Sequence, residues 1–410
     1  MGGRLDGRAR RGRGAAGVPQ ARRCAMTHRS PGAHRHRSFT LPAEQCELLH
    51  SGPMSMGGMA PPAGAGRLHS HSRKRGSVME DKQSVLLRTT PGHTRDGAAP
   101  APGGKSPSRG RSAHRGPSPP QAKIHRPIFI VGIGRSGSTI FHRMLSDHPN
   151  VTWVSGLCDR HPSRPVLSRT LQRMIDWPVV NVPLKRRYEP GECYKFWNHH
   201  CNGFAQPFRD LLASDATELN KARIPPAMAG LLTRRRRRLL FKITGWPRIG
   251  FLRELFPDAL FIHIFRDGRA VANSLLEVDF WQGWRGPQGW RWGELDEAQR
   301  AEWERHGRSF VALAGLQWKL LMDATAQAAA RIPTGQFMQL RYEDFVLDPM
   351  GHFRDVAQFC GLDWSPRFEK AIGKYNLRST NDKWRKDLTT EQQAILQSVL
   401  GQSLATYGYA

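Results

Sequence analysis

The sequence predicts an α/β domain in which a parallel β-sheet is flanked by helices. Short apolar runs recur along residues 124–410 with little polar alternation, which is typical of strands that are covered on both faces. Segments with helical spacing separate these runs, and strands that alternate with helices form parallel sheets. No internal repeat breaks this alternation.

The expected elements follow in chain order. Apolar runs predict strands at 126–133, 239–244, 259–267 and 336–345. Apolar spacing predicts helices at 138–149, 248–257, 268–280, 297–331, 349–361, 365–374 and 389–406. Residues 150–238 show poor periodicity, and a loop rich in tryptophan and glycine is expected at 281–293.

The first 123 residues differ from the rest in composition. They hold 22 Lys and Arg, 6 Asp and Glu and a single aromatic residue, so that about +16 of the formal charge of +28 lies there. Such a segment buries too little apolar surface to offset its ordering entropy. We therefore expect a disordered basic tail at 1–123 and one folded domain at 124–410. A transit peptide and a later start of translation, for instance at Met54 or Met79, stay open as alternatives.

The sequence disfavours several classes of protein. No window approaches the ~18 consecutive apolar residues of a membrane span, and the N-terminus lacks the apolar region of a secretory signal, so we expect a cytoplasmic protein. The group of Cys193, His199, His200 and Cys201 fits no common zinc spacing, and we predict no metal. The charge of about +12 outside the tail favours an anionic ligand.

The segment GIGRSGST, residues 132–139, joins the first expected strand to the first helix. Its glycines allow a phosphate to approach the backbone, its hydroxyl groups donate hydrogen bonds, and the helix N-terminus adds free N–H groups. A helix-capping turn is the alternative. Because Ser138 replaces the lysine of a P-loop and Arg135 is the only cation, this P-loop-like segment predicts a bound phosphate but not a triphosphate chain.

Two other segments follow expected strands, KIT at 242–244 and FRDGR at 265–269. Ligands of parallel sheets bind beyond the carboxyl ends of the strands. The three segments are therefore expected to converge on one site.

Together, GIGRSGST and FIHIFRDGRAVANSLLE resemble the sulfotransferases that use 3′-phosphoadenosine-5′-phosphosulfate (PAPS), in the bacterial branch with an R-S-G-[ST]-T loop. The resemblance covers about 124–410 and includes RYEDFVLDP and a terminal W…LxxxGY pattern. It implies PAPS as co-substrate and an enzyme (EC 2.8.2.-) that transfers a sulfuryl group to an acceptor hydroxyl on a sugar, glycolipid or small metabolite. A nucleotide-dependent kinase is one alternative. A non-catalytic binder of polyanions or nucleic acid through the basic tail is another, which the paired motifs disfavour.

The resemblance also implies roles for individual residues. Arg135 is expected to neutralise charge on the oxygen that bridges sulfur and the leaving phosphate, and Lys242 to touch the transferring sulfonate. Residues expected to hold the 5′-phosphate are Ser136, Gly137, Ser138 and Thr139. Residues expected at the 3′-phosphate are Arg266, Ser274 and, by a looser match, Arg378. Tyr342 is expected to face the adenine.

For the general base, the sequence departs from the family. The expected glutamate after the first helix is missing from WVSGLCD (153–159), and the expected histidine is missing from KITGW (242–246). Glu192, Asp159 and His161 remain, and we favour Glu192 because aromatic neighbours desolvate a carboxyl group.

Two further segments have two interpretations each. The loop at 281–293 either stacks on an acceptor ring or sugar, or its tryptophans cap the edge of the core. The run Arg234–Arg238 either faces a polyanion or forms a solvated basic loop.

Overall fold

The computed structural model describes residues 123–177, 179–205 and 208–409 of the chain. The tail predicted for 1–123 lies, except for Lys123, outside the described residues, so its disorder stays a prediction.

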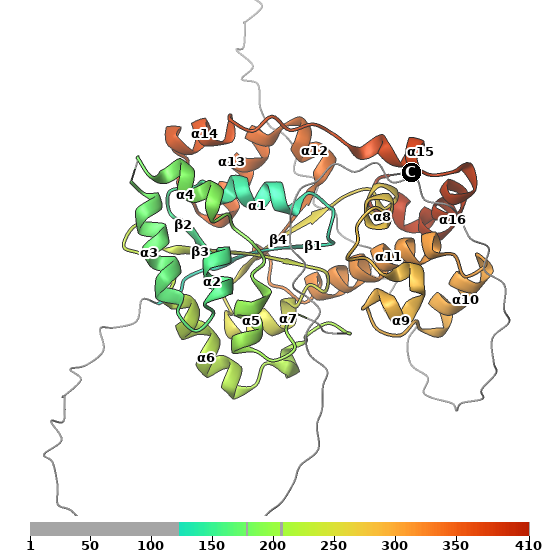
Figure 1. The fold of residues 1–410 in the computed structure, drawn as a ribbon, viewed down its shortest axis with the longest axis horizontal. Coiled ribbons are helices and arrows are strands. Elements are labelled where there is room, and N and C mark those ends of the chain that lie inside the picture. Colours follow the sequence, from blue (N-terminus) through green and yellow to red (C-terminus); the bar gives the residue numbers. More distant parts are fainter. Residues whose placement is uncertain (1–122, 178, 206–207, 410) are drawn as a thin grey trace, which may run out of the picture. The chain divides into compact units, whose positions relative to one another are not determined.

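The described residues form a parallel sheet of five strands in the order β2-β3-β1-β4-β5 (Figure 1). β1 (Ile128–Gly132) is central, between β3 (Arg238–Thr244) and β4 (Leu260–Phe265). β2 (Val151–Trp153) and β5 (Phe337–Arg341) form the edges. All four pairings are parallel, so the predicted fold class is confirmed.

Helices cover both faces of this sheet. In Figure 1, α1, α13 and α14 lie on one side of the strands, and α5, α6 and α7 lie on the other. The bounds are Ser138–Ser146 (α1), Gly156–Arg160 (α2), Pro165–Ile175 (α3), Asn181–Arg187 (α4), Tyr194–His200 (α5), Glu218–Ala229 (α6), Ile249–Leu255 (α7), Gly268–Leu276 (α8), Pro287–Trp290 (α9), Glu297–Arg305 (α10), Phe310–Ala329 (α11), Tyr342–Leu347 (α12), Pro349–Cys360 (α13), Pro366–Ile372 (α14), Trp384–Asp387 (α15) and Thr390–Thr406 (α16).

The central strand explains why its sequence is continuously apolar. Every residue of β1 is buried. Ile128 and Ile130 belong to the apolar core on one face, whereas Phe129 and Val131 belong to the core on the other. A strand with a covered surface on both sides has no position for a polar side chain.

Two predicted elements were wrong in their extent. The helix expected at 297–331 is two helices, because Gly307 and Arg308 adopt left-handed backbone (φ +61° and +58°) and Ser309 then caps α11. The strand expected at 336–345 ends at Arg341, and α12 begins at the next residue.

The region of poor periodicity, 150–238, contains β2 and the helices α2 to α6. These helices are short, and α2 buries only Cys158. In α6, Pro225 and Pro226 lie inside the helix, where proline is unfavourable. In α3, two of the four buried residues are the polar Ser168 and Gln172, so its buried face does not read as an apolar stripe.

The run Arg234–Arg238 is only partly the solvated loop expected, because Arg234, Arg235 and Arg237 are exposed but Arg236 and Arg238 are not. Arg236 is 1% exposed, and its guanidinium contacts Asp176 Oδ1 at 2.8 Å and the Val151 carbonyl oxygen at 2.7 Å. Arg238 donates to the Cys360 carbonyl at 2.7 Å. Arg236 and Arg238 therefore hold parts of the fold together, because their buried or half-buried guanidinium groups are paired with acceptors from distant segments.

Among the described residues, no helix has the length and apolar composition needed to cross a bilayer.

Candidate active site

The loop that leaves β1, residues 133–137, is tightly constrained by its surroundings. A Cβ atom on Gly132 would lie 2.4 Å from the carbonyl oxygen of Ile264. One on Gly137, which has φ of +82°, would lie 2.2 Å from Cδ2 of Tyr342. α1 begins directly after Gly137, so the free N–H groups of its first turn lie beside the loop.

Lys242 and Glu192 meet at the first turn of α1. Lys242 Nζ donates to Thr139 Oγ1 at 2.8 Å and forms an ion pair with Glu192 Oε1, also at 2.8 Å. Glu192 Oε1 accepts a second hydrogen bond, from Thr244 Oγ1 at 2.9 Å. These four residues, Thr139, Glu192, Lys242 and Thr244, are called the lysine cluster below. The structure thus brings the predicted base to the predicted sulfonate-contacting lysine.

The junction of β4 and α8 borders the loop on the other side of β1. Arg266 follows β4 directly, and its Nη1 donates to the Arg135 carbonyl oxygen at 3.3 Å. Ser274, in the second turn of α8, accepts from Arg135 Nε at 2.8 Å. Arg135 therefore connects the loop to this junction through both its backbone and its side chain.

A cavity of about 360 Å³ opens between the loop and the junction. Six predicted residues line it: Arg135, Gly137, Ser138, Thr139, Arg266 and Ser274. Eight residues that the sequence analysis did not select line it as well: Ile140, Arg143, Ala270, Asn273, Glu277, Thr380, Lys383 and Trp384. Four lining side chains are cationic and one is anionic, so the cavity suits a ligand with several anionic groups.

Two of the missed residues had a signal in the sequence. Arg143 is four residues after Thr139, which puts both on one face of α1. Lys383 lies in the DKWRKDL segment next to the selected Arg378. Arg378 itself is exposed and does not line the cavity, whereas Lys383 does.

Tyr342 and Ser136 lie beneath the cavity rather than on its wall. Tyr342 is 8% exposed, and the guanidinium carbon of Arg266 is 4.8 Å from its ring centroid. Ser136 is fully buried, and its hydroxyl has no hydrogen-bond partner among the described residues. The roles predicted for Tyr342 at the adenine and for Ser136 at the phosphate stay predictions.

The two alternative bases have other surroundings. Asp159 Oδ1 accepts hydrogen bonds from the backbone N–H groups of Lys195 (2.7 Å) and Phe196 (3.3 Å), in the first turn of α5. His161 is exposed. Among the described contacts, neither reaches the lysine cluster.

The four tryptophans of the loop 281–293 have different surroundings, and one of them, Trp284, is exposed. Trp281 and Trp290 are buried and donate to Gln317 Oε1 (2.7 Å) and the Gly293 carbonyl (2.6 Å), so they cap the core. Trp292 lies beside the lysine cluster instead, because a Cβ on Gly245, the residue after Thr244, would lie 2.5 Å from its ring.

A second cavity, of about 570 Å³, adjoins Trp292. Both chain neighbours of this tryptophan, Arg291 and Gly293, line it. Its apolar lining residues are Phe208, Pro287, Leu295 and Trp303. Trp292 thus lies near the lysine cluster, and its chain neighbours line a partly apolar cavity.

Each side of the site has a buried histidine behind it. Burial, assisted by the charges of Lys242 and Arg143, lowers the pKa of His142 in α1 to about 3. Burial alone lowers the pKa of His263 in β4 to about 3. Both imidazoles are neutral at physiological pH.

The described cysteines, Cys158, Cys193, Cys201 and Cys360, are buried free thiols. Burial raises the pKa of Cys158 to about 11, so this thiol is unreactive. In the described part of the chain, no group of three or more His, Cys, Asp or Glu side chains is arranged to hold a metal ion.

Comparisons with known proteins give a consistent result. The family model described as the sulfotransferase family matches residues 127–366. The omega-hydroxy-beta-dihydromenaquinone-9 sulfotransferase Stf3 of Mycobacterium tuberculosis is 26% identical over 69% of this chain and 75% of its own length. The protein-tyrosine sulfotransferase A of Caenorhabditis elegans is 22% identical over 60% of this chain and 53% of its own. The crystal structure of sulfotransferase STF9 from Mycobacterium avium covers 69% of this chain and 77% of its own, at 18% identity and a TM-score of 0.46.

Proposed function

Because the chain belongs to the sulfotransferase family, we propose that it transfers the sulfuryl group of PAPS to an acceptor hydroxyl, with the donor bound in the cavity between the loop and the β4–α8 junction. The observation that carries this proposal is the pairing of two cationic regions in one cavity. Arg135 and the first turn of α1 lie on one side, and Arg266 and Ser274 lie on the other. A nucleoside with phosphates at its 5′ and 3′ positions needs two such regions.

Arg135 and Lys242 are proposed to act on the reacting end of the donor. Sulfuryl transfer resembles phosphoryl transfer, in which negative charge develops on the leaving oxygen. The protein mainly positions the reacting groups and stabilises that charge. The free N–H groups of α1 are preorganised for that charge. The Arg135 guanidinium, whose Nε donates to Ser274 Oγ, is the cation of the loop that is proposed to meet it. Lys242, held 2.8 Å from Thr139 Oγ1, is fixed beside the same turn.

Glu192 is proposed as the general base that accepts the proton of the acceptor hydroxyl. Its carboxylate is fixed by Lys242 and Thr244 within the lysine cluster. A base must lie within hydrogen-bond reach of the proton it removes, and Glu192 is the predicted base that lies beside Lys242.

The second cavity supports an acceptor with an apolar body. The apolar lining of this cavity includes the Phe208, Leu295 and Trp303 side chains. The chain neighbours of Trp292, whose ring lies beside Gly245, line it as well. Named relatives act on a hydroxylated menaquinone and on protein tyrosine, and the apolar lining favours a substrate of the first kind.

The organisation of the chain is part of the proposal. We propose that 1–123 is a disordered tail and that 124–410 is the catalytic domain. A cytoplasmic location is supported by the free thiols of the four described cysteines, which are typical of a reducing compartment.

Two measurements test the proposed function. The 3′,5′-bisphosphate product (PAP) should raise the melting temperature, with about 2.7 kcal/mol of stabilisation at a hundredfold excess over Kd, whereas AMP and ATP should raise it much less. Equal shifts from ATP and PAP would favour the kinase alternative. Labelled PAPS, incubated with a library of hydroxylated quinones, sugars and phenols, then identifies the acceptor. Salt-sensitive binding of DNA or heparin without PAP binding would favour the polyanion binder.

A further inference from the structure

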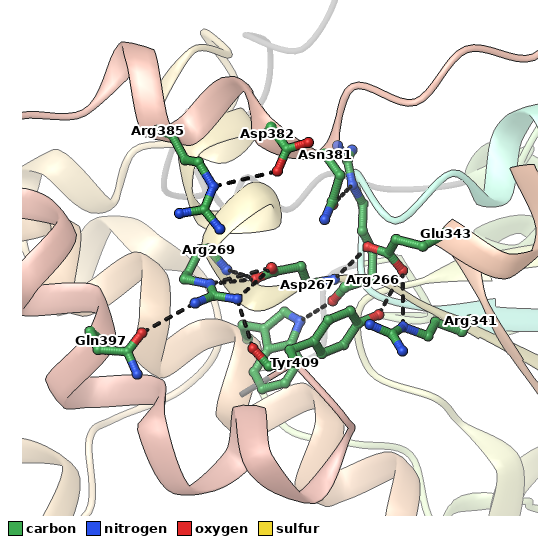
Figure 2. A network of polar contacts seen from close by, with 11 residues as sticks. Arg266, Asp267, Arg269, Arg341, Glu343, Asn381, Asp382, Arg385, Gln397 and Tyr409 are labelled. Carbon is green, nitrogen blue, oxygen red and sulfur yellow. Dashed lines mark hydrogen bonds and ion pairs between the residues drawn. The ribbon is translucent and has the colours of Figure 1, made fainter. Parts of the chain in front are cut away.

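Glu343, in the first turn of α12, connects two segments that are far apart in the sequence (Figure 2). Its Oε1 accepts a hydrogen bond from the backbone N–H of Asp267 at 3.2 Å. Its Oε2 accepts a hydrogen bond from the hydroxyl of Tyr409 at 2.8 Å. Neither partner is sequence-local, so the carboxylate holds parts of the fold together.

Tyr409 is itself fixed at several points. Its side chain is largely buried, and the guanidinium carbon of Arg341 is 4.2 Å from its ring centroid. Its carbonyl oxygen accepts from Arg269 Nη2 at 2.9 Å. Burial and the charge of Glu343 raise the pKa of Tyr409, so that its hydroxyl stays a proton donor toward the carboxylate.

Asp267, the other partner of Glu343, occupies a sensitive position. It directly follows Arg266 and is the N-cap of α8, where its carboxylate accepts from Arg269 N at 2.9 Å. Arg269 also holds that carboxylate through its guanidinium, at 2.9 Å. The backbone conformation at Asp267 therefore affects the position of the Arg266 side chain. It also affects the orientation of α8, which carries Ser274.

We propose that Glu343 is a positioning residue for the 3′-phosphate side of the donor cavity, and that Tyr409 holds Glu343 in place. This inference rests on the proposed function, because it takes Arg266 and Ser274 as the 3′-phosphate ligands. Glu343 does not line the cavity. It acts through the Asp267 N–H group, and so through the geometry of the junction.

A structural role alone predicts a different result from a positioning role. If Glu343 only stabilised the fold, its loss would lower the melting temperature and leave the PAP Kd of the folded protein unchanged. If it positions the junction, its loss weakens PAP binding and raises KM for PAPS far more than it lowers kcat, because the 3′-phosphate does not react.

The experiment uses the full chain with PAP as the probe, measured by calorimetric titration below the melting temperature. Glu343→Ala should raise the PAP Kd at least about tenfold, the scale of one lost hydrogen bond to a charged group. Tyr409→Phe should raise it about threefold. Glu343→Gln keeps an acceptor for the Asp267 N–H and should restore most of the affinity.

Glu369→Ala is the matched control. Glu369 is also held by two partners, Trp364 Nε1 at 2.7 Å and Arg354 at 3.7 Å, but it lies in α14 and does not line the cavity. Its loss should lower stability without changing the PAP Kd.

Several outcomes would overturn the inference. These are an unchanged PAP Kd in Glu343→Ala, an equal loss in Glu369→Ala, or no rescue by Glu343→Gln. If the wild-type protein failed to bind PAP, the proposed function would fail instead. In that case, the exchange rate of the Asp267 backbone N–H in the ligand-free protein would test whether Glu343 holds this group. Glu343→Ala should accelerate that exchange, whereas Glu369→Ala should not.

Discussion

The two anion-binding sides of the cavity are built in different ways. The side proposed for the 5′-phosphate is mainly local: one loop, residues 133–137, runs from a buried strand into α1, and Lys242 is its distant contact. The 3′ side is non-local: Arg266 contacts Arg135 and Thr380, and the residue after it is held by Glu343 and, through it, Tyr409. A local site depends on a few backbone conformations, whereas a non-local site depends on the packing of the domain. Substitutions on the first side should therefore mainly change kcat, and substitutions on the second side should mainly change the Kd of PAP.

The largest effect is expected from Arg135→Ala on the 5′ side. Arg135 is proposed to meet charge that exists mainly in the transition state, so kcat should fall by at least about 100-fold, the scale for one lost donor to a developing oxyanion. The PAP Kd should rise less. Arg135→Lys, which keeps a cation, should retain more turnover. Near-normal kcat with lost affinity would make Arg135 a binding residue only.

Arg266→Ala should show the opposite balance. The 3′-phosphate does not react, so the loss appears mainly in affinity, and the PAP Kd should rise at least about tenfold. Turnover at saturating PAPS should fall much less. Arg253→Ala, which removes a guanidinium bonded to the Arg331 carbonyl at 2.9 Å, is the control and should leave both constants unchanged. A large fall in kcat with an unchanged Kd would contradict the assignment of the 3′ side.

A smaller effect is expected in the pH dependence of stability. The pKa of His263 is about 3 in the folded protein against an ordinary 6.5. Between these values the unfolded chain binds a proton that the native state does not, so the free energy of unfolding falls by about 1.4 kcal/mol for each pH unit below 6.5. His263→Gln should reduce the slope between pH 6 and pH 4 by that amount, as measured by urea unfolding. Above pH 7 the two slopes should agree, and equal slopes at acid pH would contradict the prediction.

Removal of the first 119 residues should have the smallest effect. A chain that begins at residue 120 retains β1 and all of the described residues that line the cavity. It should fold and bind PAP with an unchanged Kd, as measured by circular dichroism and calorimetry. Loss of folding would show that the proposed boundary at 123 is wrong.

The same contrast explains what the sequence could predict. The β1–loop–α1 unit and the end of β4 were found because each is one continuous segment with a recognisable pattern. Thr380, Lys383 and Glu343 were missed or left without a role, because only the fold brings them near Arg266. Lys242 and Glu192 are 50 residues apart, and only the structure puts them in contact.

The fold was predicted where an apolar run is long, as in β1 and β4, and missed where an element is short or its buried face is partly polar. Within 150–238, β2 has only three residues, α2 buries only Cys158, and two of the four buried residues of α3 are Ser168 and Gln172. Arg236 shows a further limit: five consecutive arginines suggest a charged surface, but the middle one is buried against Asp176. Composition does not show which of several consecutive arginines will be buried and paired with a carboxylate.

The ring of Tyr342 lies against Gly137 on one side of the cavity and near Arg266 on the other. Tyr342 therefore packs against both regions that are proposed to bind the donor. A ligand that carries both phosphates at the matching span would gain the second contact as an intramolecular event, which is chelation. A nucleotide with all of its phosphates on one carbon would lack the group for the second region, so the proposed selection of the donor depends on the distance between its phosphates.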